Sequence, residues 1–309
     1  MKRNIIAICL LIVVALATIM LAINVRKQEE SKFNIVTSFY PMYIAALNIT
    51  DGVEDVTVKN LTEQTTGCIH DYVLTTSELV TLAKADVLVI NGASMEGFMD
   101  KVISNFANLQ IVDASDGIIL IEAECHEQHD EHNEHHGHNH EINPHVFVSV
   151  KNYIKQVQNI CDALVEFDAE NAEKYMKNTT SYIIKLEELS KDIEQTMSKL
   201  NYTNIVTYHN TFDYFAKDYG LSVVGTIENE HGKTPSAGEI ATLMEKIKEN
   251  NIKAIFVESE YSIKLVDVIA KETGANVYVL NPVTSGTNNK DEYLNIMRRN
   301  LLVLKQALQ

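Results

Sequence analysis

A long helical pattern near the middle of the chain most constrains what the chain can fold into. From Asp168 to Leu200, apolar side chains recur at helical spacing for about thirty residues without Gly or Pro. At about 1.5 Å per residue, a helix over this range would be about 45 to 50 Å long, which is more than one lobe needs. We therefore expect this helix to connect two lobes.

Short apolar runs alternate with amphipathic segments on both sides of this helix. The expected strands are 33–38, 56–61, 86–91, 110–113, 204–208, 222–227, 253–258 and 276–280. The expected helices are 42–49, 77–84, 96–106, 150–165, 211–219, 236–250, 262–273 and 290–308. Strands separated by helices of this length predict an α/β fold of βαβ units with mostly parallel sheets. We place the first lobe at 33–166, the linking helix at 168–200 and the second lobe at 202–309.

A tract rich in histidine and acidic residues lies at 123–141, within the range of the first lobe. It has too little apolar surface to offset the entropy of ordering, so we expect a mobile loop. Neutral imidazole suits Zn, Cu, Ni and Fe, so the tract predicts an auxiliary, low-affinity collector of divalent metal ions. A solvated linker without a ligand and a remnant of a tag are the alternatives. Its histidines are His126, His129, His132, His135, His136, His138 and His140.

The first segment, 1–27, has the character of a targeting signal. Two basic residues precede an apolar run from Ile5 to Ile23, and Arg26 and Lys27 follow it. The run is long enough to span a bilayer, and no good cleavage site follows it. We expect an uncleaved membrane anchor that leaves the body outside the cytoplasm, at the cell surface or in a periplasm. A cleaved signal peptide is the alternative.

The body of the chain is strongly acidic. From residue 28 onward it carries 22 basic and 42 acidic residues, a net charge of −20. This charge argues against a nucleic-acid partner and favours attraction of cations. Cys68, Cys125 and Cys161 are an odd number of cysteines in the body, so they do not form a disulfide framework, and the sequence assigns them no role.

Three isolated histidines fall at the ends of expected ordered elements. His70 lies in the turn after a strand, His209 ends the strand at 204–208, and His145 leads the short apolar run 146–148. Ligands of open α/β sheets bind beyond the carboxyl ends of strands, where the pattern places His70 and His209. A metal ion bound by all three would lie in the cleft between the lobes. Each histidine taken alone could equally be an ordinary, partly buried side chain.

Short motifs surround these histidines and extend beyond them. They are His-Asp-Tyr at 70–72, Pro-His-Val at 144–146, Tyr-His-Asn-Thr-Phe-Asp-Tyr-Phe at 208–215, Tyr-Gly-Leu at 219–221, Thr-Pro-Ser-Ala-Gly-Glu at 234–239 and Ile-Phe-Val-Glu-Ser at 255–259. With them, the chain from about Phe33 to Gln309 resembles the metal-binding components of ABC transporters, in the cluster A-I (cluster 9) family. Within that family it is most similar to the zinc-uptake branch.

The resemblance implies a fold and a function. It implies two Rossmann-like lobes with parallel sheets, tied by one rigid backbone helix, with a single metal ion in the cleft and a His-rich loop near its mouth. His70, His145 and His209 fall on the ligand positions of the family. The protein would then be a monomeric binding protein without enzymatic activity, which delivers Zn²⁺ to a membrane permease of an ABC transporter.

The chain departs from the family pattern at several positions. The family usually has Asp before the Pro-His pair and Trp after it, where this chain has Asn143 and Phe147. The carboxylate that serves as fourth ligand has no match in the turn at 280–285. Manganese-binding relatives carry a carboxylate where this chain has His209, so the resemblance points to zinc. We expect water or a nearby carboxylate as fourth ligand, with Glu230 and Glu258 as secondary candidates.

The three histidines are also compatible with other functions. Three histidines with an open fourth position also describe a catalytic zinc site, as in zinc hydrolases. The chain has no HExxH helix and no nucleophile elbow to position a base or nucleophile, so we expect no enzyme. A manganese-binding protein, a surface adhesin or a metal sensor on the same fold are further alternatives.

The histidine tract predicts weak metal sites that are separate from one tight site on the three isolated histidines. Deleting residues 126–140 should leave one tight equivalent of zinc and remove additional weak equivalents, because a flexible tract offers only adaptable coordination. Calorimetric titration of the deletion variant beside the intact chain checks this. Loss of the tight equivalent would show that the tract itself forms the main site.

Overall fold

A computed structural model gives the architecture of the chain. It describes residues 32–62, 72–122, 142–228, 235–259 and 263–309, together with 14–16, 18 and 20, and only the backbone of 100 and 101. Among these residues, no helix combines the length and the apolar character needed to cross a bilayer.

The first sheet is parallel and contains four strands in the order β2-β1-β3-β4. They are β1 (Phe33–Thr37), β2 (Val56–Asn60), β3 (Val87–Ile90) and β4 (Gln110–Asp113), with α2 (Tyr40–Ile49) and α3 (Thr76–Leu82) on the connections. The helix expected at 96–106 is shorter, with a 3₁₀ turn at Gly97–Met99 followed by α4 (Asp100–Ile103). It ends early because Asn105 and Phe106 donate to carbonyls three residues back, which closes the segment as a turn.

The second sheet repeats this topology in the order β6-β5-β7-β8, again with all strands parallel. Its strands are β5 (Asn204–Thr207), β6 (Ser222–Thr226), β7 (Ala254–Val257) and β8 (Asn276–Val279). Its helices are α7 (Asp213–Tyr219), α8 (Ala237–Glu249), α9 (Lys264–Thr273) and α10 (Glu292–Leu308). Ser236 and Glu239 form a capping box at the start of α8, as their spacing predicts. The fold class expected from the sequence is therefore confirmed.

The linking helix is confirmed but is shorter than its sequence pattern suggests. α6 (Ala172–Met197) has 26 residues and is therefore about 39 Å long. It begins late because Asp168 separates it from α5 (Val150–Phe167) with a non-helical backbone at φ −132°. The Asp168 carboxylate accepts hydrogen bonds from Asn171 and from the Tyr175 hydroxyl, which fix the corner between the two helices.

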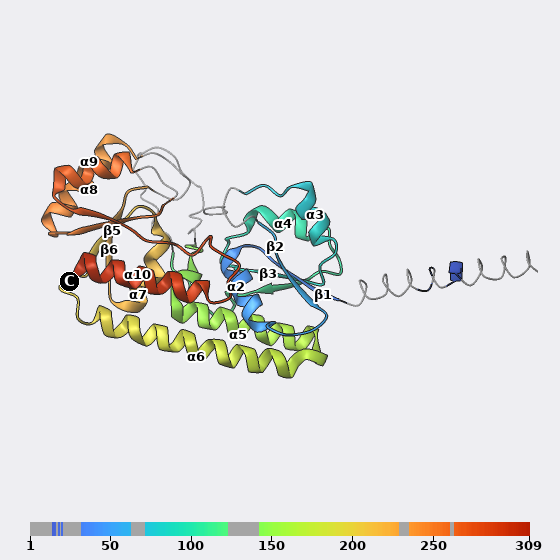
Figure 1. Cartoon of the computed structure of the whole chain (residues 1–309). Coiled ribbons are helices and arrows are strands. Elements are labelled where there is room, and N and C mark those ends of the chain that lie inside the picture. The colour runs from blue at the N-terminus through green and yellow to red at the C-terminus, as the bar shows by residue number, and fades with distance from the viewer. Residues whose placement is uncertain are drawn as a thin grey trace, which may run out of the picture.

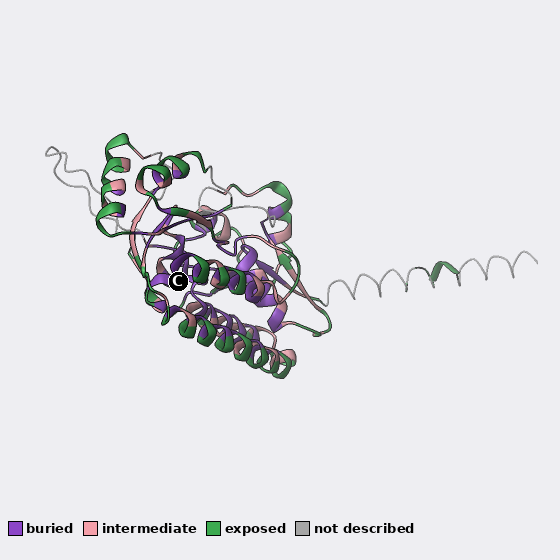
Figure 2. Cartoon of the chain, turned by 60° about the vertical axis from the view of Figure 1, so that its left-hand side comes forward, coloured by how far each residue is buried: buried purple, intermediate pink, exposed green. Residues whose placement is uncertain are grey.

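One hydrophobic core extends through both lobes. α6 runs along the lower side of the molecule beneath both sheets, with α5 and α10 above it (Figure 1). The same core cluster contains Ile35 of β1 and Ile205 of β5, together with Leu186 of α6 and Met297 of α10. Two smaller clusters cover the opposite faces, under α3 and α4 in the first lobe and under α8 and α9 in the second. In Figure 2, the buried residues of the helices face the sheets and exposed residues follow their outer surfaces.

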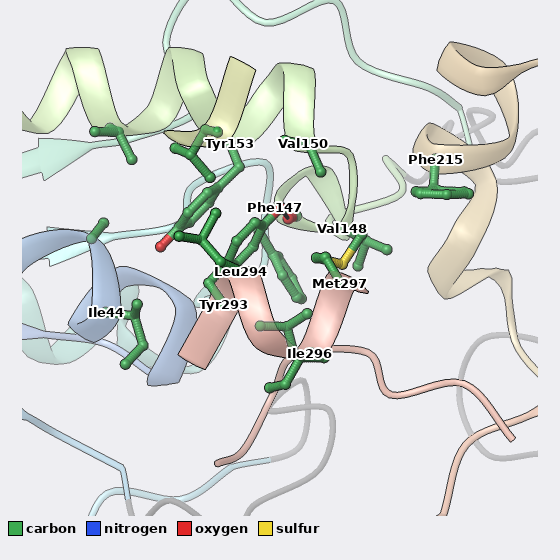
Figure 3. Packing of buried hydrophobic residues seen from close by; sticks show 14 of the residues in the cluster. Ile44, Phe147, Val148, Val150, Tyr153, Phe215, Tyr293, Leu294, Ile296 and Met297 are labelled. Carbon is green, nitrogen blue, oxygen red and sulfur yellow. Dashed lines mark hydrogen bonds between the residues drawn. The ribbon is translucent and has the colours of Figure 1, made fainter. Parts of the chain in front are cut away.

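The start of α5 lies against α10 at the centre of this core. Tyr153 stacks on Tyr293 with ring centroids 3.7 Å apart, and the Tyr293 hydroxyl donates to the Phe147 carbonyl at 2.9 Å. Figure 3 shows Phe147, Val148 and Val150 packed beside Leu294, Ile296 and Met297. The C-terminal helix therefore supports the backbone just after His145, so α6 is not the sole link between the lobes.

Candidate metal centre

The structure describes two of the three predicted histidine ligands. His145 is fully buried and precedes the 3₁₀ turn η2 (Val146–Val148) at the start of α5. His209 is 7% exposed and follows β5, at the carboxyl end of the second sheet. His70, Glu230 and the histidine tract lie outside the described residues. Within the described part of the chain, no group of three or more His, Cys, Asp or Glu is placed to hold a metal ion.

The two described histidines face each other across the lobes. Their ring centroids are 5.0 Å apart and their planes meet at 88°. Two imidazoles that coordinate one tetrahedral zinc ion, with Zn–N bonds of about 2.0–2.1 Å, place their centroids roughly 5 Å apart. The pair therefore has the separation that a shared zinc ion requires.

Asn143 holds His145 through both its backbone and its ring. Asn143 is fully buried, and its Oδ1 accepts the His145 backbone N–H at 3.0 Å and lies 2.9 Å from His145 Nδ1. Its Nδ2 donates to the Asn210 carbonyl at 2.9 Å and to Asp213 Oδ2 at 3.1 Å. Asn143 therefore joins one predicted ligand to the backbone that follows the other.

A tyrosine of the second lobe strengthens the same contact. The Tyr214 hydroxyl donates to the Asn143 carbonyl at 2.8 Å and accepts the Ile121 backbone N–H at 2.9 Å. Its ring packs with Ala93 and Val146 in a small apolar cluster of the first lobe. The segment that carries His145 is thus fixed against α7 by both hydrogen bonds and packing.

His209 is held by a residue of its own turn. Its Nδ1 lies 2.9 Å from the hydroxyl of Thr211, which is 2% exposed. Nδ1 of each ring therefore has a supporting partner, as is common for histidines in metal sites. Because a hydroxyl can donate or accept, Thr211 orients the ring without fixing its tautomer.

A buried carboxylate follows β7 of the second sheet. β5 and β7 pair in parallel with Thr207 opposite Phe256, and His209 and Glu258 each come two residues after their own member of that pair. Glu258 is 2% exposed. Burial, then the hydrogen bond to Glu228, and then the charges of Glu228 and Glu258 raise the pKa of Tyr208 to about 12. Acidic groups therefore surround the carboxyl end of the second sheet, where they favour a cation.

The turn after β8 has a structural role in this chain. The side chain of Asn281 accepts the Val283 backbone N–H at 2.7 Å, and its backbone makes two hydrogen bonds with the Asn300 side chain. Val283 adopts a left-handed backbone at φ 67°, which this hydrogen bond helps to hold. The Asn281 side chain thus stabilises its own turn.

Behind His145 lies a buried polar network that begins at Glu96. Glu96 accepts hydrogen bonds from the Ser38 hydroxyl at 2.6 Å and from the backbone N–H groups of Asn91 and Gly92 at 2.7 and 3.1 Å. Asn91 in turn donates to the carbonyl of Pro144, the residue before His145, at 2.9 Å. Desolvation by burial raises the pKa of Glu96 to about 7.

Sequence reasoning missed the groups that support the histidines. In the sequence, Asn143 stands out only as a departure from the family pattern, and no motif assigns a role to Asp213 or Glu96. Asn143 stands two residues before a predicted ligand, and the polar partners of metal-bound histidines tune such sites. Its contact with Asp213 joins residues 70 positions apart, and no local pattern predicts such a contact.

Comparisons with known proteins identify the family of the chain. The family model for ZnuA, described as zinc-uptake complex component A, periplasmic, matches residues 35–307. The chain is 35% identical over 288 residues to the high-affinity zinc uptake system protein ZnuA of Bacillus subtilis, covering 91% of this chain and 89% of that protein. It is 31% identical over 308 residues to the zinc-binding lipoprotein AdcA of Streptococcus pneumoniae, covering 97% of this chain but 60% of AdcA.

A solved structure with the same architecture is the laminin-binding protein of Streptococcus agalactiae. It is described as a bifunctional protein with adhesin and metal-transporting activity. The TM-score is 0.77 at 25% sequence identity, and the match covers 90% of this chain and 100% of that one.

The buried Glu96 predicts a specific pH dependence of stability. Its folded-state pKa is raised from 4.5 to about 7, so the folded state binds more protons than the unfolded state between these values. Stability of the metal-free protein should therefore fall by about 3 kcal/mol as pH rises from 4.5 to 7. Denaturant unfolding at pH 5 and pH 7.5 should show a smaller decline for Glu96→Gln. Glu194→Gln, at an exposed position, is the control, and equal declines in all three proteins would contradict the assignment.

Proposed function

The chain belongs to the ZnuA family of zinc-uptake components, and from this premise we propose that it captures Zn²⁺ outside the cytoplasm and delivers it to an ABC-type uptake transporter. In this proposal Zn²⁺ is the cargo. The family is one of solute-binding proteins, and the relatives ZnuA and AdcA are named for zinc uptake and zinc binding.

The observation that carries the proposal is the pair of histidines. His145 and His209 come from different lobes, and their ring centroids are 5.0 Å apart, which suits one tetrahedral ion. Both rings are held through Nδ1, by Asn143 and Thr211, so the ligand nitrogens are preorganised. Preorganised imidazoles favour tight binding because little conformational entropy is lost when the ion arrives.

We propose His70 as the third ligand, with the fourth position taken by water or by a carboxylate. Glu258 is supported by its burial just after β7, and Glu230 by its place after a strand of the second lobe. Nitrogen-rich tetrahedral coordination suits zinc, whereas manganese prefers more oxygen ligands and a higher coordination number. The histidine at position 209 therefore favours zinc over manganese.

Binding without catalysis is part of the same proposal. A zinc hydrolase needs a base or nucleophile placed beside an open coordination position. The chain has no HExxH motif and no nucleophile elbow to supply one, and its family is one of binding proteins. We therefore propose that the site captures and releases the ion without chemical change to a substrate.

The partners and the location follow from this role. We propose a monomer that docks on a membrane permease, held at the membrane by residues 1–27 and with its body on the extracytoplasmic side. The tract at 123–141 would gather zinc weakly near the cleft. The likeness to the laminin-binding protein of Streptococcus agalactiae supports adhesion as a second candidate function on the same fold.

Single substitutions of the framework histidines test the site. His70→Ala, His145→Ala and His209→Ala should each weaken zinc binding by orders of magnitude, because each removes a proposed nitrogen ligand. His231→Ala is the matched control, a histidine that follows Glu230 in the sequence and is outside the proposed ligand set, and should bind zinc as the unchanged chain does. Competition calorimetry with zinc and manganese provides the measurement. A silent substitution among the three, or equal competition by manganese, would overturn the zinc assignment.

A further inference from the structure

The orientation of the Asn143 amide is fixed by its neighbours. Two acceptors, the Asn210 carbonyl and Asp213 Oδ2, face Nδ2 at 2.9 and 3.1 Å. A donor, the backbone N–H of His145, faces Oδ1 at 3.0 Å. A flipped amide would place its oxygen against both acceptors in a fully buried position, so the flipped orientation is excluded.

This orientation determines the tautomer of His145. An amide oxygen accepts hydrogen bonds and cannot donate them, and it lies 2.9 Å from His145 Nδ1. Nδ1 must therefore carry the hydrogen, which leaves the lone pair on Nε2. Nε2 is the nitrogen that the proposed zinc site requires, so the tautomer is already correct before the ion arrives.

The Asp213 carboxylate bonds to the Asn143 amide and so connects to the His145 ring through that amide. Asp213 Oδ2 accepts from the same amide whose oxygen accepts from His145, so the three groups form a chain from carboxylate to amide to imidazole. A carboxylate that polarises such a chain strengthens the hydrogen bond to Nδ1 and makes Nε2 a better donor to metal. The carboxylate belongs to α7 of the second lobe, four residues after His209.

We propose that Asn143 and Asp213 act together as positioning residues of the zinc site. They hold His145 in the Nδ1–H tautomer and couple its orientation to contact between the two lobes. The inference rests on the proposed zinc-binding function and adds to it two residues that do not themselves touch the ion. Asn143 and Asp213 are also a matched pair, because an aspartate at 143 would face the Asp213 carboxylate and the Asn210 carbonyl in a buried site.

The tautomer can be measured without any metal. Long-range ¹H–¹⁵N NMR spectra of the metal-free full chain, at a pH where the imidazole is neutral, should show His145 as the Nδ1–H form. Asn143→Ala should shift His145 toward a mixture of tautomers. Asn48→Ala is the matched control. Asn48 is also a buried amide that crosses between lobes, since it donates to the Lys290 carbonyl at 2.7 Å, but it is not among the groups hydrogen-bonded around His145.

Zinc affinities of a small variant set complete the test. Asn143→Ala should weaken zinc binding by about 10- to 100-fold, the usual range for a lost supporting partner, whereas Asn48→Ala should not. Asp213→Asn in the unchanged chain should weaken binding by several-fold, because it removes the charge and keeps an acceptor oxygen. In the Asn143→Asp background, the same Asp213→Asn change should instead strengthen binding by roughly tenfold, because it relieves the clash of two carboxylates.

The opposite sign of the Asp213 effect is the decisive result. If Asp213→Asn has the same effect in both backgrounds, the two residues do not act as a pair, and the inference is wrong. If Asn143→Ala does not fold, the comparison of the Asp213 variants still decides the matter. The tautomer measurement keeps this inference separate from the proposed function. A fixed Nδ1–H form with no loss of zinc affinity in His145→Ala would contradict the zinc site while leaving the positioning role of Asn143 intact.

Discussion

The shared hydrophobic core is the constraint on which the rest of the structure depends. Two histidines that come from different lobes can keep a separation of 5.0 Å only if the lobes are fixed relative to each other. The same core cluster contains strands of both sheets together with α5, α6 and α10, so relative motion of the lobes would disturb close-packed side chains. The hydrogen bond from the Tyr293 hydroxyl to the Phe147 carbonyl ties this core to the backbone two residues after His145. The geometry of the metal centre is therefore a consequence of core packing.

Electrostatics and hydrogen bonding then determine what this rigid frame can bind. The acidic body, with a net charge of −20 from residue 28 onward, raises the local concentration of cations. Between the lobes, the imidazoles supported by Asn143 and Thr211 are nitrogen donors of the kind that suits zinc. Burial of these supports costs free energy unless each polar atom finds a partner, and the contacts of Asn143 with Asn210 and Asp213 meet that requirement. Together these features suit a site that takes up a bare divalent ion.

The sequence predicts most of the fold because its signals are local. Apolar periodicity locates the strands and most helices, and Ser236 and Glu239 locate the start of α8. It overestimates α6, because the bonds from Asn171 and Tyr175 that turn the chain at Asp168 leave no trace in periodicity. It predicts His145 and His209 as ligands from motif and strand position. It cannot predict that Asn143 reaches Asp213, or that Glu96 supports Pro144 through Asn91, because tertiary packing creates those contacts.

The central claim is that one zinc ion lies between the two lobes on His145 and His209. Anomalous diffraction from crystals of the zinc-loaded full chain, recorded on both sides of the zinc absorption edge, tests this directly. We expect one strong peak at bonding distance, about 2.0–2.1 Å, from Nε2 of both histidines. A strong peak that contacts neither ring, or that is held by the histidine tract alone, would contradict it.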